Sequence, residues 1–202
     1  MSSTRLARLV ASAVALAAPV PLLAQSSPAT GSAFEVRVPS GHFIGTGDQR
    51  GQLKNANATA VQLSWLVRPQ LAVTGTFSWA RSRDLAAGNA PKLDVFTSDL
   101  GLEVRTATHQ GPARLDFSGF AGLGAGARSY NHRSLDVAAT HNIAGYAAVG
   151  GAARLGRVGV RLEARDYATG FRPLVGRGTS TLRNDVVVMV AITLHSGRGA
   201  VR

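Results

Sequence analysis

Two residues of the chain, His132 and Ser134, are of the types that serve as base and nucleophile in acyl transfer. A serine hydroxyl becomes nucleophilic when an imidazole takes its proton, and a carboxylate must orient that imidazole. Asp136 lies close in sequence, and Glu163 follows further along the chain. The same residues also fit a polar surface loop. We favour the loop, and we predict no catalytic residue.

Other chemistry finds less support in the sequence. The glycines Gly122, Gly124 and Gly126 lack the spacing of a phosphate-binding loop, and no helical segment follows them. The chain has no cysteine, which excludes thiolate metal sites, disulfides and a cysteine nucleophile. No metal-ligand spacing occurs among the histidines, which are His42, His109, His132, His141 and His195. We therefore predict no metal and no cofactor.

Composition indicates one folded domain of moderate hydrophobicity. The chain has 202 residues, of which 45% are hydrophobic and 16% are charged. It can bury an apolar surface and is not a disordered tail. The net charge of +11 suggests nucleic acid as a partner. However, Lys54 and Lys92 are the only lysines, and the basic residues form no runs.

The first residues have the features of a secretory signal peptide. Arg5 and Arg8 precede an uninterrupted apolar stretch, 9–18, and Leu22-Leu23-Ala24 is typical of a processing site. The stretch is about half as long as a membrane-spanning helix needs, so a membrane anchor is the weaker alternative. We expect a cleaved leader over 1–24 and a short periplasmic linker over 25–33. Export makes nucleic acid an unsuitable partner, and loss of the two arginines lowers the net charge from +11 to +9.

The remaining chain alternates between apolar and polar residues with a period of two. Val61, Leu63 and Trp65, for example, alternate with Gln62 and Ser64. This period is that of β-strands, and no convincing helical segment follows the leader. Each segment extends over about 10–14 residues, which suits a tilted strand that crosses a membrane. The eight predicted strands are centred on 34–38, 59–67, 71–79, 96–105, 114–123, 142–149, 158–165 and 185–194.

Connections between these strands alternate in length. Long connections are expected at 45–57, 81–92, 128–138 and 169–182, and short ones at 68–70, 109–112 and 155–157. Outer-membrane barrels have short periplasmic turns and longer outer loops. The pattern therefore predicts an all-β protein, an eight-stranded antiparallel up-and-down transmembrane β-barrel over 34–195, with a C-terminal tail over 196–202.

Charged residues of the strands all fall on the less apolar face. Because charge facing lipid costs about 2–4 kcal/mol per Arg or Lys near the midplane, closure should turn these residues inward. Equal numbers of acids and bases can satisfy each other as a hydrogen-bonded network. We therefore expect a plugged lumen. The predicted interior network consists of Glu35, Arg37, Asp99, Glu103, Arg105, Arg114, Asp116, Arg161, Glu163 and Arg165.

Aromatic residues of the apolar face avoid the middle of the strands. Trp and Tyr are favoured where a membrane meets water, and outer-membrane barrels carry an aromatic girdle at each interface. The sequence therefore predicts two aromatic belts. The lower belt would contain Phe34, Trp65 and Phe117, and the upper belt Phe77, Trp79 and Phe96.

The whole segment 34–195 resembles the small eight-stranded outer-membrane barrels of Gram-negative bacteria, the OmpA, OmpX and OmpW group. Its last strand, 185–194, is similar to the strand that ends such proteins. Those chains usually end on an aromatic residue, whereas this one continues from His195 to Arg202. The resemblance implies a porin-like fold, a cell outer membrane location and recognition by the outer-membrane assembly machinery. We expect a monomer.

The predicted outer loops carry more basic than acidic residues. Guanidinium groups bind phosphate in a bidentate manner, and the outer leaflet presents lipopolysaccharide phosphates. Arg128 is expected on such a loop. As candidates for lipopolysaccharide contact we name Arg172, Arg177 and Arg183.

Four functions remain compatible with the sequence. The first is a non-enzymatic envelope or adhesion barrel in contact with outer-membrane lipid. The second is an OmpW-like barrel that transports an apolar ligand. The third is a lipid A esterase, because His132-Arg133-Ser134 resembles the H-x-S element of the lipid A deacylases, although Leu135 replaces their asparagine. The fourth is a soluble lipocalin-like barrel. We favour the first.

Overall fold

The computed structural model describes residues 33–133, 135–171 and 181–196. The predicted leader over 1–24, nearly all of the linker and nearly all of the tail lie outside these residues. The strands form where β-branched, aromatic and leucine residues recur at every second position, with alanine and glycine at some of these positions. The described chain forms a single sheet.

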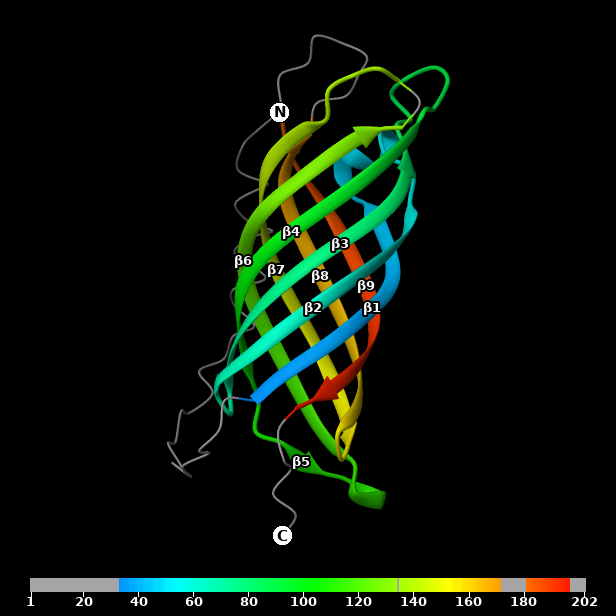
Figure 1. The fold of residues 1–202 in the computed structure, drawn as a ribbon. Coiled ribbons are helices and arrows are strands. Elements are labelled where there is room, and N and C mark those ends of the chain that lie inside the picture. The colour runs from blue at the N-terminus through cyan, green and yellow to red at the C-terminus, as the bar shows by residue number, and fades with distance from the viewer. Residues whose placement is uncertain (1–32, 134, 172–180, 197–202) are drawn as a thin grey trace. The chain divides into compact units, whose positions relative to one another are not determined.

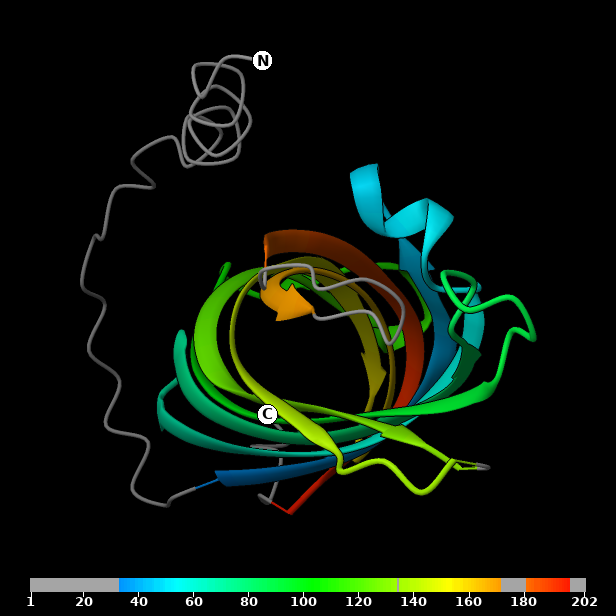
Figure 2. The same ribbon diagram turned by 90° about the horizontal axis from the view of Figure 1, so that it is seen from above.

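Eight long strands build this sheet, and each is antiparallel to its neighbours (Figure 1). The order β4-β3-β2-β1-β9-β8-β7-β6 is closed by pairing of β4 with β6, so the sheet has no open edge and seen from above it forms a ring (Figure 2). The long strands are β1 (Ala33–Gly45), β2 (Ala56–Arg68), β3 (Leu71–Arg83), β4 (Lys92–Arg105), β6 (Asp116–His132), β7 (Thr140–Leu155), β8 (Val158–Phe171) and β9 (Thr181–His195).

The two faces of the wall differ as the alternation predicts. Along β2, buried and exposed residues alternate without interruption from Ala56 to Trp65. Apolar side chains of the outer face are widely exposed, for example Leu123 at 69%, Leu100 at 67% and Ile143 at 85%. A soluble protein would bury such residues, whereas hydrocarbon accommodates them. In the described ranges no helix is long and apolar enough to cross a membrane.

Connections define two ends of the barrel. At the turn end, β2 joins β3 through Pro69-Gln70, and β7 joins β8 through Gly156-Arg157. Gly156 has a φ of +61°, a conformation that glycine adopts without strain. At the loop end lie the segments 46–55, 84–91 and 133–139, and the first contains the 3-10 helix η1 (Gly47–Gly51).

Two predicted boundaries are wrong. The connection after β4 is not a short turn at 109–112 but extends over 106–115, with the small strand β5 (His109–Gln110) and the 3-10 helix η2 (Pro112–Arg114). The loop predicted from residue 128 begins only at Arg133, because β6 continues to His132 and pairs with β4 along its length. At the second boundary, pairing of β6 with β4 as far as His132 carries the strand past the predicted start of the loop.

Candidate functional site: the lumen and the loop-end rim

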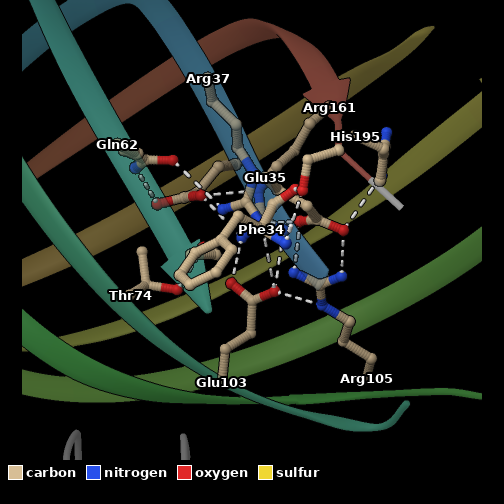
Figure 3. A network of polar contacts seen from close by, with 12 residues as sticks. Phe34, Glu35, Arg37, Gln62, Thr74, Glu103, Arg105, Arg161 and His195 are labelled. Atoms are coloured by element: carbon tan, nitrogen blue, oxygen red, sulfur yellow. Dashed lines mark hydrogen bonds and ion pairs between the residues drawn. The ribbon is translucent and has the colours of Figure 1, made fainter. Parts of the chain in front are cut away.

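Charged side chains fill the turn-end half of the lumen, and Glu35 of β1 is their first centre (Figure 3). Arg105 Nη1 and Nη2 donate to the two carboxylate oxygens of Glu35, both at 2.7 Å. Arg37 Nη2 donates to Glu35 Oε2 at 2.5 Å, and His195 Nε2 lies 3.0 Å from Oε1. Residues from the first strand, the last strand and β4 therefore meet at one carboxylate.

Glu103 of β4 is the second centre. Arg105 Nε donates to Glu103 Oε1 at 2.7 Å. Arg161 of β8 binds the same carboxylate with two donors, at 3.1 and 2.6 Å. Such a two-pronged bond is the strongest geometry open to a guanidinium and a carboxylate. Arg161 thus links β8 to β4 across the barrel.

Glu163 of β8 is the third centre and carries the network toward the loop end. Arg161 Nε donates to it at 2.8 Å, and Arg165 Nε donates to its other oxygen. Gln62 bridges the first and third centres, since its amide accepts from Arg37 at 3.4 Å and donates to Glu163 at 3.3 Å. The network is therefore continuous across the lumen.

Asp99 completes the interior network. Arg165 Nη1 donates to Asp99 Oδ1 at 2.9 Å, and the Tyr167 hydroxyl donates to Oδ2 at 2.8 Å. Eight of the sequence-predicted network residues meet in this way, and we call them the lumen network. They comprise four acids and four arginines: Glu35, Asp99, Glu103, Glu163, Arg37, Arg105, Arg161 and Arg165.

A repeated local pattern produces this arrangement. An acid and an arginine stand two residues apart in Glu35-Val-Arg37 and in Glu103-Val-Arg105. On β8 a glutamate stands between two such arginines, in 161–165. Residues two apart share one face of a strand, so each pair enters the lumen together. Each charged group thereby brings a partner with it, which offsets much of the cost of leaving water.

Aromatic rings occupy the space between the arginines. The guanidinium carbon of Arg161 lies 3.1 Å from the ring centroid of Phe120. Arg165 lies 4.5 Å from the ring of Tyr146. The planar guanidinium stacks on such faces without losing its in-plane hydrogen bonds. These rings and the arginines stacked on them therefore share the interior of the lumen.

Two predicted members of the network lie elsewhere. Arg114 is exposed in η2, with a φ of +59°, outside the barrel wall. Asp116 begins β6 at the turn-end mouth, where it accepts from Arg154 at 2.8 Å. The expectation for Arg114 is corrected because the strand begins later than the alternation suggested.

Nearer the loop end, the lumen contains residues that sequence reasoning did not assign to it. Arg128 was expected on a loop, but it points inward from β6 and is 1% exposed. It pairs with Asp185 of β9, and its Nε donates to the Thr97 hydroxyl at 3.0 Å. Its guanidinium also lies 4.3 Å from the ring centroid of Tyr167. The regular alternation of 128, 130 and 132 was the signal that could have placed Arg128 inward.

The residues considered for acyl transfer lie in different environments. His132 is buried, and its Nε2 lies 3.2 Å from Asp84 Oδ2, a carboxylate that the sequence reasoning did not consider. Asp136 is exposed, and Glu163 belongs to the lumen network. Ser134 lies outside the described residues.

The predicted aromatic residues fall on the outer face at both ends of the barrel. At the turn end, Phe34 and Trp65 are directly opposed on β1 and β2. Phe117 lies near the start of β6 and is 44% exposed. At the loop end, Trp79 and Phe96 are opposed on β3 and β4 and stack at 6.2 Å. Phe77 is 6.3 Å from the Phe96 ring, so the upper group forms one aromatic cluster.

Basic residues at the loop end occupy several environments. Of the three candidates for lipopolysaccharide contact, Arg172 and Arg177 lie outside the described residues. Arg183 is half-buried on β9, two residues before the inward-facing Asp185. Arg133 lies just beyond β6 and donates twice to Asp94, at 2.6 Å each. These hydrogen bonds raise the pKa of the Arg133 guanidinium.

A closed barrel of eight antiparallel strands, apolar outside and polar inside, defines the class of small outer-membrane β-barrels. The protein has this fold, which confirms the fold class predicted from the sequence. An outer-membrane location follows from the lipid-facing wall.

Solved structures of this class are similar to the chain. Neisserial surface protein A has a TM-score of 0.54 at 11% identity, and the match covers 81% of this chain and 99% of that protein. Outer membrane protein AlkL has a TM-score of 0.46 at 13% identity, over 89% and 96% of the two chains. The N-terminal β-barrel domain of Pseudomonas aeruginosa OprF has a TM-score of 0.46 at 10% identity, over 82% and 99%. At such identity the likeness to Neisserial surface protein A establishes the fold alone.

No protein-family model matches the chain, and no curated protein sequence matches it either.

Proposed function

We propose that this protein is a non-enzymatic, non-conducting outer-membrane barrel with a structural role in the cell envelope. The observation that carries the proposal is the lumen network, in which every charge has a partner and every arginine forms an ion pair with an acid on another strand. A channel for ions or polar solutes needs water-filled space and accessible charge. Here buried ion pairs and stacked rings take that space instead.

The network also supports a structural role by connecting distant strands. Arg161 bonds β8 to β4, and Arg105 bonds β4 to β1. His195 adds the last strand to the same cluster through Glu35. Cross-barrel bonds of this kind resist deformation of a thin wall, because a change in shape would leave buried charges unpaired. We take a monomer to be the functional state, inserted by the outer-membrane assembly machinery.

Electrical recording in planar bilayers tests the proposal. The unaltered protein should insert without current steps, whereas a variant with Arg37→Gly, Arg161→Gly and Arg165→Gly should conduct because its lumen is emptied. A heat-dependent mobility shift must show that both proteins are folded. Regular current steps from the unaltered protein would overturn the sealed lumen and favour transport.

The second part of the proposal is contact with lipopolysaccharide, and the excess of basic residues in the predicted outer loops supports it. Replacement of Arg172, Arg177 and Arg183 by alanine should lower the lipopolysaccharide that copurifies with the folded barrel. An unchanged lipopolysaccharide content would remove these three arginines from the proposal while leaving the sealed barrel intact.

A further inference from the structure

Four cations form a continuous row on the outer face of the loop end. We call Lys54, Arg83, Lys92 and Arg133 the outer basic row. The Lys54 amide donates to the Arg83 carbonyl at 3.0 Å, and the Arg133 amide donates to the Lys92 carbonyl at 3.1 Å. Arg83 and Lys92 are direct partners in the pairing of β3 with β4. All four side chains are exposed, so four neighbouring chain segments present one cation each at the same level.

Backbone pairing holds the cations of the row next to one another although their charges repel. Like charges directly opposite each other destabilise a strand pair, and Arg83 faces Lys92 in this way. Within the described residues, no carboxylate forms an ion pair with Lys54, Arg83 or Lys92. A bound anion would turn this repulsion into attraction. The arrangement is therefore that of an anion site rather than of a salt-bridged surface.

Asp94, the hydrogen-bond partner of Arg133, is already neutralised. It faces outward on β4 and accepts both hydrogen bonds of Arg133, at 2.6 Å each. On its other side Asp94 is the strand partner of Arg81, which is stacked over the Trp79 ring at 4.2 Å. This carboxylate, which could repel an anion at this place, is thus covered, and Asp94 is 7% exposed.

The level of the row relative to the membrane identifies the anion. Trp79 and Phe96 mark the upper aromatic cluster, and such rings sit where hydrocarbon gives way to headgroups. Arg83 follows Trp79 by four residues, which places it about 10 Å higher for a strand tilted as in outer-membrane barrels. Below Trp79 and Phe96, the exposed side chains of Phe77 and Leu100 face the acyl chains. A ligand of the row would therefore have phosphates at headgroup level and acyl chains below.

We propose that the outer basic row binds the phosphorylated sugar head of an outer-leaflet glycolipid, with its acyl chains against the wall of β3, β4 and β6. The proposal rests on the outer-membrane location in the proposed function, and it moves the main lipopolysaccharide contact away from Arg172, Arg177 and Arg183. Lys54, Arg83 and Lys92 supply the charge, and Arg133 holds Asp94. Trp79 would lie beside the bound lipid, so its fluorescence should change on binding.

Fluorescence of Trp79 tests the proposal in the full-length folded barrel. Trp65, the only other tryptophan, is removed by Trp65→Phe, and the protein is placed in phosphatidylcholine vesicles that contain increasing diphosphoryl lipid A. The variant with Lys54→Gln, Arg83→Gln and Lys92→Gln should bind lipid A about 10- to 100-fold more weakly, since each surface cation contributes about a tenfold factor or somewhat less.

A matched control removes the same charge from the other end. Arg68, Arg114 and Arg157 are exposed at the turn end, so their replacement by glutamine should leave lipid A affinity within about twofold. Equal weakening in both variants, or no weakening in the row variant, would overturn the proposal. Heat-dependent mobility must show that each variant is folded.

Competing ligands separate the glycolipid from simpler anions. Dephosphorylated lipid A and phosphatidylglycerol should bind much more weakly than diphosphoryl lipid A, and inorganic phosphate should not displace it at equal concentration. Equal binding of phosphatidylglycerol would indicate a general anionic surface, and displacement by phosphate would indicate a small-anion site. Either result overturns the proposal. Neither bears on the sealed lumen, which the electrical recording tests separately.

Asp94→Asn supplies an effect of opposite sign. It removes the carboxylate and leaves Arg133 available to the lipid phosphates. Lipid A should then bind more tightly, by up to about tenfold. A weaker affinity in this variant would contradict the electrostatic basis of the site.

Discussion

The lumen network and the outer basic row use the same residue types under opposite conditions. In the lumen, arginines are buried, and acids on their own or facing strands neutralise them. On the outer row, cations are exposed, and three of the four have no ion-pair partner among the described residues. The interior charges thus neutralise one another, whereas those of the outer basic row remain available to the proposed ligand.

The difference follows from what surrounds each group. A buried charge must find its partner within the protein, because water cannot replace it. An exposed charge is solvated, so its presence costs little and a ligand can still compete for it. Removing charge from the two regions should therefore have effects of different size and sign.

The largest effect is expected from the lumen. Glu103→Gln keeps the shape of the side chain but leaves Arg105 and Arg161 without their shared carboxylate. The free energy of unfolding should fall by about 3–5 kcal/mol, since removing one partner of a buried ion pair leaves the other charge buried and unpaired. Urea unfolding of the detergent-refolded barrel, followed by tryptophan fluorescence, measures this. A loss below about 1 kcal/mol would contradict the view that the network is tightly coupled.

A smaller effect on stability is expected at the Arg128–Asp185 pair, which lies nearer the loop end than the lumen network. Arg128→Met and Asp185→Leu should each destabilise the barrel, and the double variant should lose less than their sum. We expect a coupling energy of about 1–3 kcal/mol, because the double change removes both charges and leaves no unpaired charge buried. Unfolding of all four proteins in one detergent measures the cycle. Strict additivity would show that the two side chains act independently.

A third effect compares the inner and outer faces through two neighbouring glycines. Gly124 faces inward, and a methyl group there would collide with the Tyr146 ring and the Leu100 carbonyl. Gly145 lies on the next strand, and a methyl group there would meet only the Gly124 carbonyl at 3.9 Å. Gly124→Ala should cost about 1–3 kcal/mol of stability, whereas Gly145→Ala should be neutral or slightly stabilising. Equal losses would show that the ring of Tyr146 is not packed closely against the wall.

The smallest effect is expected on the outer row. Lys92→Gln removes one of two opposed like charges, so stability should rise by about 0.2–1 kcal/mol at low salt. Added salt should abolish the gain, because the row is exposed and screened. Lys92→Arg keeps the charge and serves as the control. Destabilisation by Lys92→Gln would mean that the row has a partner within the protein.

Much of the wall could be predicted because its pattern is local. Residues two apart share a face of a strand, so Glu35-Val-Arg37 and Glu103-Val-Arg105 each predict a charged pair on the inner face. The same rule gives the apolar outer wall and the aromatic residues at its two levels. At Arg114 the alternation was extended beyond the strand, and at Arg128 it was ended too early, because pairing with a partner strand decides how far the alternation extends.

The sequence by itself determined the strands, their two faces and the balance of charge on the inner one, because these depend on a period of two along the chain. Only the tertiary structure decided which acid meets which arginine, that Tyr146 covers Gly124, and that Lys54, Arg83, Lys92 and Arg133 form one row. These contacts join segments far apart in sequence, and their register exists only once β4 pairs with β6 and closes the barrel.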